Sequence, residues 1–122
     1  MTDNESFHEL TVSDEGWMHP IDPRMNREPA GSLLLARAAA IRNAQNAALR
    51  EVALPLAAAI SPSLAELVER ELVPRSSEFV HDRQVITESR TEPSDGGAFY
   101  RVQLRVVLDL RRLHTELDRL RR

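Results

Sequence analysis

The sequence predicts an α+β fold: a small three-stranded, mainly antiparallel sheet covered on one face by a long alanine-rich helix, with a short second helix and a C-terminal helix. Residues 98–109 alternate between apolar and polar side chains, which is typical of a strand with one buried and one solvated face. Turn residues at 93–97 separate this strand from another strand-like segment, residues 78–90. Because an isolated hairpin is only marginally stable in water, its apolar face needs a cover, and the alanine-rich segment is the best candidate.

The two faces of the second hairpin strand differ in character. The apolar face carries Tyr100, Val102, Leu104, Val106 and Leu108. The polar face carries Arg101, Gln103 and Arg105, with Arg83 and Arg90 of the first strand as candidates to join them and Phe99 and Val107 for apolar contact. Two interpretations stay open. The face is solvated, with ion pairs to Glu88 or Glu92 worth less than about 1 kcal/mol each, or it docks an acidic partner.

Upstream of the hairpin, residues 1–6 are polar, and we expect them to form a loose tail. The pattern from Phe7 to Ser13 predicts a short strand, and the sequence Asp14-Glu15-Gly16 predicts the turn that ends it. We expect Trp17, beside this turn, to cover the core. The prolines between His19 and Gly31 predict an extended loop over residues 19–31.

The next segment predicts a helix from Leu33 to about Leu54, with Ser32 as its N-cap. Its predicted stripe consists of Leu34, Ala38, Ile41, Gln45, Ala48 and Val52, while Arg42, Asn46 and Arg50 lie on another face. The alanines between residues 36 and 44 favour a helix and allow it to approach a sheet closely. Pro55 is expected to kink or end this helix, and residues 56–60 could continue it briefly.

Two further helices are predicted. One starts at Ser61 or Ser63, because Pro62 suits a first helical turn and Ser63 with Glu66 matches a capping box; Pro74 limits it to about three turns. The other covers residues 110–122, where leucines recur at spacings of three and four. Its stripe consists of Leu110, Leu113, Leu117 and Leu120. This helix is too short to be stable alone, so it docks either on its own domain or on another subunit.

The composition fits a single globular domain spanning residues 1–122. The formal net charge of -3 argues against a dedicated nucleic-acid binder, whose footprint is usually basic. The absence of cysteine excludes disulfides, thiol catalysis and cysteine-ligated zinc. No apolar run approaches the roughly 20 residues needed to span a bilayer, and the N-terminus lacks the pattern of a signal peptide.

The residue types that usually carry chemistry are scattered. No spacing typical of a metal site relates His8, His19, His81 and His114. The sequence also lacks a phosphate-binding loop, a dinucleotide fingerprint and a nucleophile elbow. Since aromatic residues make up only 4% of the chain and the core is modest, there is little room for a substrate pocket. We therefore expect no enzyme activity, no cofactor, no metal and no small-molecule substrate.

Charge is distributed unevenly along the chain. The first fifteen residues contain Asp3, Glu5, Glu9, Asp14 and Glu15 and no basic residue other than histidine. The last twelve contain Arg111, Arg112, Arg119, Arg121 and Arg122 against Glu116 and Asp118. The two segments are either solvated, or they meet head to tail between neighbouring subunits.

The order of the elements resembles that of a known family. A strand ending in V-S-D-E-G-W (12–17) precedes A-R-A-A-A-I-R-N-A-Q-N-A-A-L-R-E-V-A (36–53), a linking helix and the hairpin V-I-T-E-S-R-T-E-P-S-D-G-G-A-F-Y-R-V-Q-L-R-V-V-L-D (85–109). This resembles the N-terminal domain of FlgT, a flagellar assembly protein, and related small envelope lipoprotein domains. The resemblance implies a periplasmic, non-enzymatic building block that helps to form a ring around the flagellar rod.

Together these features predict a structural or assembly module that acts through protein contacts, as a homo-oligomer or with ring neighbours. The expected contact residues are Leu110, Leu113, Leu117, Leu120, Arg101 and Arg105. The compartment is the periplasm if the resemblance holds, and otherwise the cytoplasm. Two alternatives stay open: a nucleic-acid-binding module that uses the C-terminal arginines and depends steeply on salt, or a subunit of another ring such as a phage connector.

Overall fold

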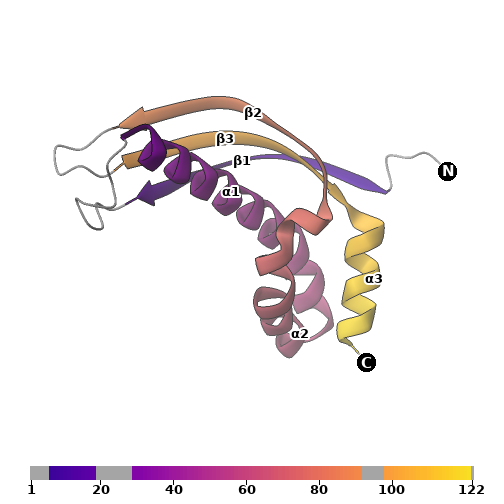
Figure 1. Cartoon of the computed structure of the whole chain (residues 1–122). Coiled ribbons are helices and arrows are strands. Elements are labelled where there is room, and N and C mark those ends of the chain that lie inside the picture. Colours follow the sequence, from indigo (N-terminus) through magenta and orange to yellow (C-terminus); the bar gives the residue numbers. More distant parts are fainter. Residues whose placement is uncertain (1–5, 19–28, 92–97, 122) are drawn as a thin grey trace.

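The computed structural model describes residues 6–18, 29–91 and 98–121 (Figure 1). The elements follow the order β1 (Phe7–Met18), α1 (Pro29–Ile60), α2 (Pro62–Leu67), the π-helical turn η2 (Val68–Leu72), the 3₁₀ segment η3 (Val73–Phe79), β2 (Val80–Thr91), β3 (Ala98–Asp109) and α3 (Leu110–Leu120). The predicted α+β class is confirmed, with three strands, one long helix, a second helix and a C-terminal helix. The predicted turn at 93–97 lies outside the described residues.

The sheet has the strand order β1-β3-β2, and both strand pairs are antiparallel. β3 is therefore the central strand, which explains why its alternation is the clearest in the sequence. β1 pairs with β3 without a shift from Phe7 opposite Asp109 to Met18 opposite Ala98. The pairing of β2 with β3 shifts twice, between Val80 and Asp82 and between Val85 and Thr87. The hairpin that the alternation predicts is confirmed.

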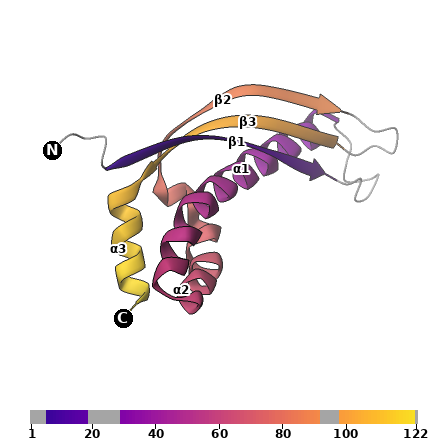
Figure 2. The same cartoon turned by 180° about the vertical axis from the view of Figure 1, so that it is seen from behind.

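The sheet is curved, and α1 lies beneath it, while α2 and α3 extend on the same side from one end (Figures 1 and 2). Among the described elements, no helix covers the opposite face. One core joins the sheet to the helices, and its largest fully buried side chains are Phe79, Leu49, Leu72, Leu104, Leu108, Leu113, Val68, Val102 and Val106. The sheet therefore has one buried face and one open face.

The contact between α1 and the sheet is made mainly by small side chains. Ala36, Ala40, Ala44 and Ala48 recur at steps of four and are fully buried. Gly16 on β1 faces this seam so closely that a Cβ atom there would lie 2.3 Å from the Ala36 carbonyl oxygen and 2.4 Å from the Ala40 nitrogen. The apolar stripe predicted for this helix is wrong at its first residue, because Leu34 is 68% exposed. The helix is rotated so that its alanines, and not its leucines, meet the strand.

Two predicted boundaries near the N-terminus are wrong. β1 continues to Met18, with Gly16 opposite Tyr100, so Asp14-Glu15-Gly16 is part of a strand and not a turn. The glycine is needed for close approach to the helix, a requirement that looks like a turn signal in the sequence. α1 begins at Pro29, which corrects the loop prediction at residues 29–31 and excludes Ser32 as an N-cap. The rest of that loop, residues 19–28, lies outside the described part of the chain.

α1 does not end at Pro55 but continues to Ile60. Of the two outcomes expected at this proline, the end of the helix is therefore wrong. Ser61 then caps α2, because its hydroxyl accepts a hydrogen bond from the Leu64 nitrogen at 3.2 Å. The alternative start at Ser63, with its capping box, is wrong. The helical path does not stop near Pro74 but changes to η2 and η3, and Pro74 lies in the first turn of η3.

α3 begins at its N-cap Asp109, whose carboxylate accepts a hydrogen bond from the Arg112 nitrogen at 3.2 Å. Leu113 is fully buried and Leu117 is 3% exposed, both within the chain's own core. Leu110 and Leu120 pack partly buried against that core. The helix therefore docks on its own domain, and Leu113 and Leu117 are not available as surface contacts, which corrects that part of the predicted interface.

We expect Gly16→Ala to lower the free energy of unfolding by about 3 kcal/mol or more, because the new methyl group would press on the backbone of α1 and not on a movable side chain. Urea unfolding followed by circular dichroism measures the change. Ser13→Ala, on the same strand but exposed, is the matched control and should change stability by less than about 0.5 kcal/mol. Equal stability of the two variants would contradict the close approach.

Candidate functional site

The open face of the sheet is the candidate functional surface. Alternate residues of a strand share a face, and the strand register assigns to the open face Phe7, Glu9, Thr11, Ser13, Glu15 and Trp17 of β1; Phe99, Arg101, Gln103, Arg105 and Val107 of β3; and Asp82, Gln84, Thr87, Ser89 and Thr91 of β2. Three strands backed by α1 hold these side chains, so the face is a rigid platform.

The middle of the open face is ionic. Arg105 lies between the two outer strands and pairs with Glu9 at 2.6 Å and with Asp82 at 3.2 Å. The hydrogen bond that Arg105 donates to Glu9 is the main reason why the pKa of Arg105 is raised above its ordinary value. Arg101 pairs in the same way with Glu15 on β1. Both predicted contact arginines therefore lie on the open face, and both are neutralised by acids of neighbouring strands.

Three of the residues predicted to accompany these arginines, Glu88, Arg83 and Arg90, lie on the other face of the sheet, so that part of the prediction was wrong. Glu88 lies opposite Val102, on the helix side of the sheet, and Glu92 lies outside the described residues. Arg83 and Arg90 lie opposite Val106 and Tyr100, so they also belong to the helix side. The shift between Val80 and Asp82 places Arg83 on the helix side, and the second shift, between Val85 and Thr87, returns Glu88 and Arg90 to the face of Val80.

Each end of the open face carries an aromatic pair. Phe7 and His81 have ring centroids 4.2 Å apart at one end. Trp17 and Phe99 lie 4.7 Å apart at the other end, with planes inclined by 52°. Trp17 is 52% exposed, so its predicted role as a cover of the core is wrong. A Trp held on a rigid surface is a residue type that often dominates the energy of protein contacts.

The helix side of the sheet holds a polar cluster at its margin. The Tyr100 hydroxyl donates to Glu88 at 2.5 Å, and Arg37 of α1 pairs with the same carboxylate at 3.3 Å. The hydrogen bond from Tyr100, followed by the contact with Arg37, lowers the pKa of Glu88. Burial, followed by the hydrogen bond to Glu88, raises the pKa of Tyr100. The cluster joins β2, β3 and α1.

The groove between α1 and β2 does not gather catalytic groups. A groove of about 300 Å³ between α1 and β2 is lined by Leu34, Arg37, Ala38, Ile41, Arg42, Gln45 and Arg83. Arg37 is engaged by Glu88 and Arg83 by Gln45, and the lining contains neither a carboxylate nor a histidine that could act as a base. The described part of the chain also holds no cluster of three histidine, cysteine, aspartate or glutamate residues that could bind a metal ion.

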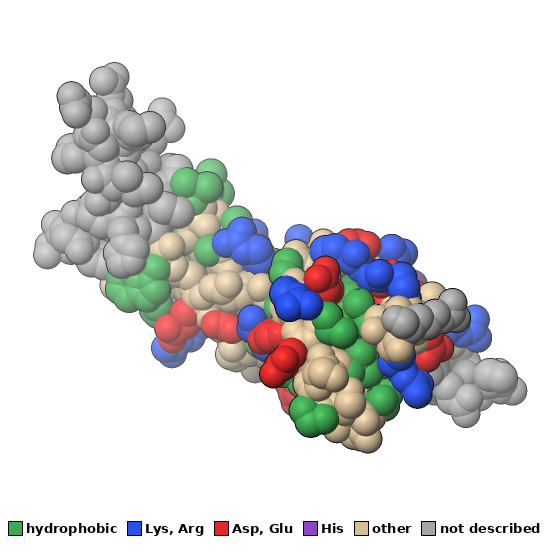
Figure 3. Space-filling model, turned by 90° about the horizontal axis from the view of Figure 1, so that it is seen from below, with side chains coloured by type: hydrophobic (Ala, Val, Ile, Leu, Met, Phe, Trp, Pro, Cys, Tyr) green, Lys and Arg blue, Asp and Glu red, His purple; other side chains and the backbone are tan. Residues whose placement is uncertain are grey.

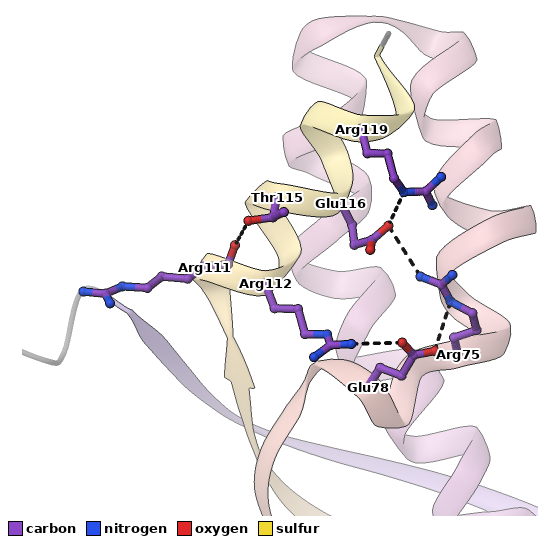
Figure 4. Close-up of polar contacts among 7 residues, drawn as sticks. All are labelled: Arg75, Glu78, Arg111, Arg112, Thr115, Glu116 and Arg119. Atoms are coloured by element: carbon purple, nitrogen blue, oxygen red, sulfur yellow. Dashed lines mark hydrogen bonds and ion pairs between the residues drawn. The ribbon is translucent and has the colours of Figure 1, made fainter.

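The arginines of α3 are largely engaged within the chain (Figure 4). Arg112 pairs with Glu78 at 3.2 Å, and Arg119 pairs with Glu116 at 2.8 Å. Arg75 of η3 joins the two pairs, because it lies 3.1 Å from Glu78 and 3.5 Å from Glu116. Its Nε atom is near Glu78 but forms no hydrogen bond. Seen from below, basic and acidic side chains are interspersed (Figure 3). Arg112 and Arg119 are therefore both neutralised by acids of the same chain.

The fold and its surface define a small α+β module with an open, aromatic-flanked sheet face. Comparisons with protein-family models, with curated proteins and with solved structures find no significant match. In the described ranges, no helix has the length and apolar character needed to cross a membrane.

The signal for the exposed aromatic end was present in the sequence. A period of two continues from Glu9 through Glu15 to Trp17, but the glycine between the last two residues indicated a turn. Phe99 was recognised as a surface residue, whereas its partner Trp17 was not. The pairing of Phe7 with His81 depends on the bulge after Val80 and could not be found from spacing.

The lowered pKa values of Glu88 and Glu116 predict a loss of stability in acid. The pKa of Glu116 is lowered chiefly by its hydrogen bond from Arg119. A carboxylate whose pKa is lowered by folding stabilises the protein above its ordinary value of 4.5, and this contribution disappears as the pH falls through the folded-state pKa. We therefore expect the free energy of unfolding to fall below about pH 4.5.

Urea unfolding at a series of pH values between 7 and 3 checks this dependence. The double variant Glu88→Gln/Glu116→Gln should show a smaller loss of stability over this range than the wild type. Glu51→Gln is the matched control, because Glu51 is exposed and makes no ion pair within the described residues. An unchanged pH dependence in the double variant would exclude these two carboxylates as its source.

Proposed function

We propose that this chain is a non-enzymatic structural or assembly module that acts through protein–protein contacts. The observation that carries the proposal is the open face of the sheet, where Trp17, 52% exposed, lies beside Phe99 on a platform backed by α1. Protein contacts use such a surface well, because a rigid aromatic anchor loses little conformational freedom on binding. The ion pairs in the middle of the face leave it with little net charge.

The assembly that we propose is of the ring or envelope type, such as the flagellar basal body. The support is the resemblance of the strand, alanine-rich helix and hairpin to FlgT-like and related envelope domains, together with the α+β class of the fold. The corresponding compartment is the periplasm. Contacts that build a ring must lie on two different surfaces of each subunit, and the open face supplies one of them.

Site-specific photo-cross-linking in cells that make the protein tests the proposal. A photoreactive amino acid replaces Ser89, which is exposed on the open face, and in a control it replaces Ala58, which is exposed on α1. We expect discrete covalent adducts with defined protein partners from position 89 and not from position 58. Adducts that are equally frequent at both positions, or absent at position 89, would contradict contact through the open face.

A further inference from the structure

The two edges of the sheet are protected to different degrees. β2 is interrupted by two shifts in register, and Asp82 and Arg83 lie near the first of them. Bulges and charged side chains are the usual means by which natural edge strands resist pairing with other chains. β1 pairs with β3 over its whole length without a shift and contains no proline, and its acids Glu9 and Glu15 are each paired with an arginine of β3. β1 is therefore the less protected edge.

Two hydrogen bonds establish which backbone groups of β1 point outward. The Leu110 nitrogen donates to the Ser6 carbonyl at 2.8 Å, so residue 6 faces the β3 side. The Asn43 side chain of α1 donates to the Glu15 carbonyl at 2.8 Å, so residue 15 faces away from β3. Because orientation alternates along an antiparallel strand, the backbone groups of the odd-numbered residues of β1 point outward.

The outward groups of Glu15 are already satisfied, since its nitrogen also donates to the Asp14 carboxylate at 2.8 Å. Within the described part of the chain, no hydrogen-bond partner is found for the outward backbone groups of Phe7, Glu9, Thr11 and Ser13. In Figure 2, β1 forms a free border of the sheet. The unsatisfied run thus covers residues 7–13 and has Leu10 at its centre.

We propose that this edge pairs with β1 of a second copy of the chain, antiparallel and with a two-fold axis at Leu10. In this register Thr11 lies opposite Glu9 of the partner subunit, and Ser13 lies opposite Phe7 of the partner subunit. The pairing uses the outward groups of residues 7–13 on both copies and stops where Asn43 and Asp14 cap Glu15. The result is a continuous six-stranded sheet. The inference rests on the proposed function, of which it names one contact.

Charge complementarity favours this occupant. In the same register, Ser6 lies opposite Asp14 of the partner subunit. Arg111 directly follows Leu110, which is bonded to Ser6, and its side chain points away from the ion-pair network of α3 (Figure 4). Arg111 has no acidic partner among the described residues, so it can meet the partner's Asp14, and the two-fold axis creates this pair twice. Glu9 stays neutralised by Arg105 of its own sheet.

Disulfide trapping tests the register, because the chain has no cysteine of its own. Across the axis, the Cα atoms at position 10 of the two copies would be about 4.5 Å apart, within the range of a disulfide. The two positions 13 would be about 20 Å apart. Under mild oxidation, purified Leu10→Cys should therefore form a covalent dimer, and the control Ser13→Cys should not. No dimer from Leu10→Cys, or equal dimer from both variants, would overturn the proposal.

The hydrogen bonds and the charge pair are tested on the purified full chain by analytical ultracentrifugation. Thr11→Pro removes an outward N–H group and no bond to β3, so it should raise the dimer dissociation constant at least about tenfold, whereas Thr11→Ala should not. Asp14→Arg and Arg111→Asp should each weaken the dimer, and the double variant should restore it. Circular dichroism checks that each variant folds. If Thr11→Pro does not fold, the charge reversals at positions 14 and 111 test the dimer in its place.

The outcomes separate this inference from the proposed function. A chain that stays monomeric at every soluble concentration would overturn the β1 pairing, but the cross-linking result at position 89 on the open face would still stand by itself. A dimer that is unaffected by Thr11→Pro and by charge reversal would show that the copies meet through another surface. A dimer with the Leu10 register and no adducts at position 89 would support β1 pairing alone.

Discussion

The fold depends on the close approach of the α1 backbone to β1 at Gly16. At this point the strand has no side chain and the helix offers only alanines, so the two backbones lie nearly in contact. This constraint determines how α1 is rotated. Its alanine seam faces the sheet, and Leu34 and Leu35 consequently remain exposed. The other face of the sheet stays open, because α2 and α3 extend on the same side as α1.

The charged residues are arranged mainly as local, partly exposed pairs. Arg105 joins β1 to β2 across β3, Glu88 joins β2 to α1, and Glu116 joins α3 to η3. Exposed pairs of this kind each contribute little to stability. Each pair nevertheless connects two different elements of the fold. They also remove the excess positive charge that the arginine content of α3 had indicated.

The sequence predicted the parts of the structure that depend on regular periodicity. The alternation of β3 identified the central strand, its buried face and the hairpin, and the alanines identified the helix that covers it. Errors arose where one residue type serves two purposes. Gly16 indicated a turn although it permits helix contact, and the leucines of α3 indicated an interface although they fill the core. The register shift after Val80 decides the face of Arg83, so that face could not be derived from spacing.

The two unoccupied surfaces of the sheet have different consequences for assembly. A pairing of β1 with β1 is isologous, so it closes after two copies and cannot by itself produce a ring. The open face is perpendicular to that edge and is not consumed by it, because the edge uses backbone groups whereas the face uses side chains such as Trp17 and Arg101. A ring built from this chain would therefore need both: the edge to form pairs, and the open face to join each pair to its neighbours.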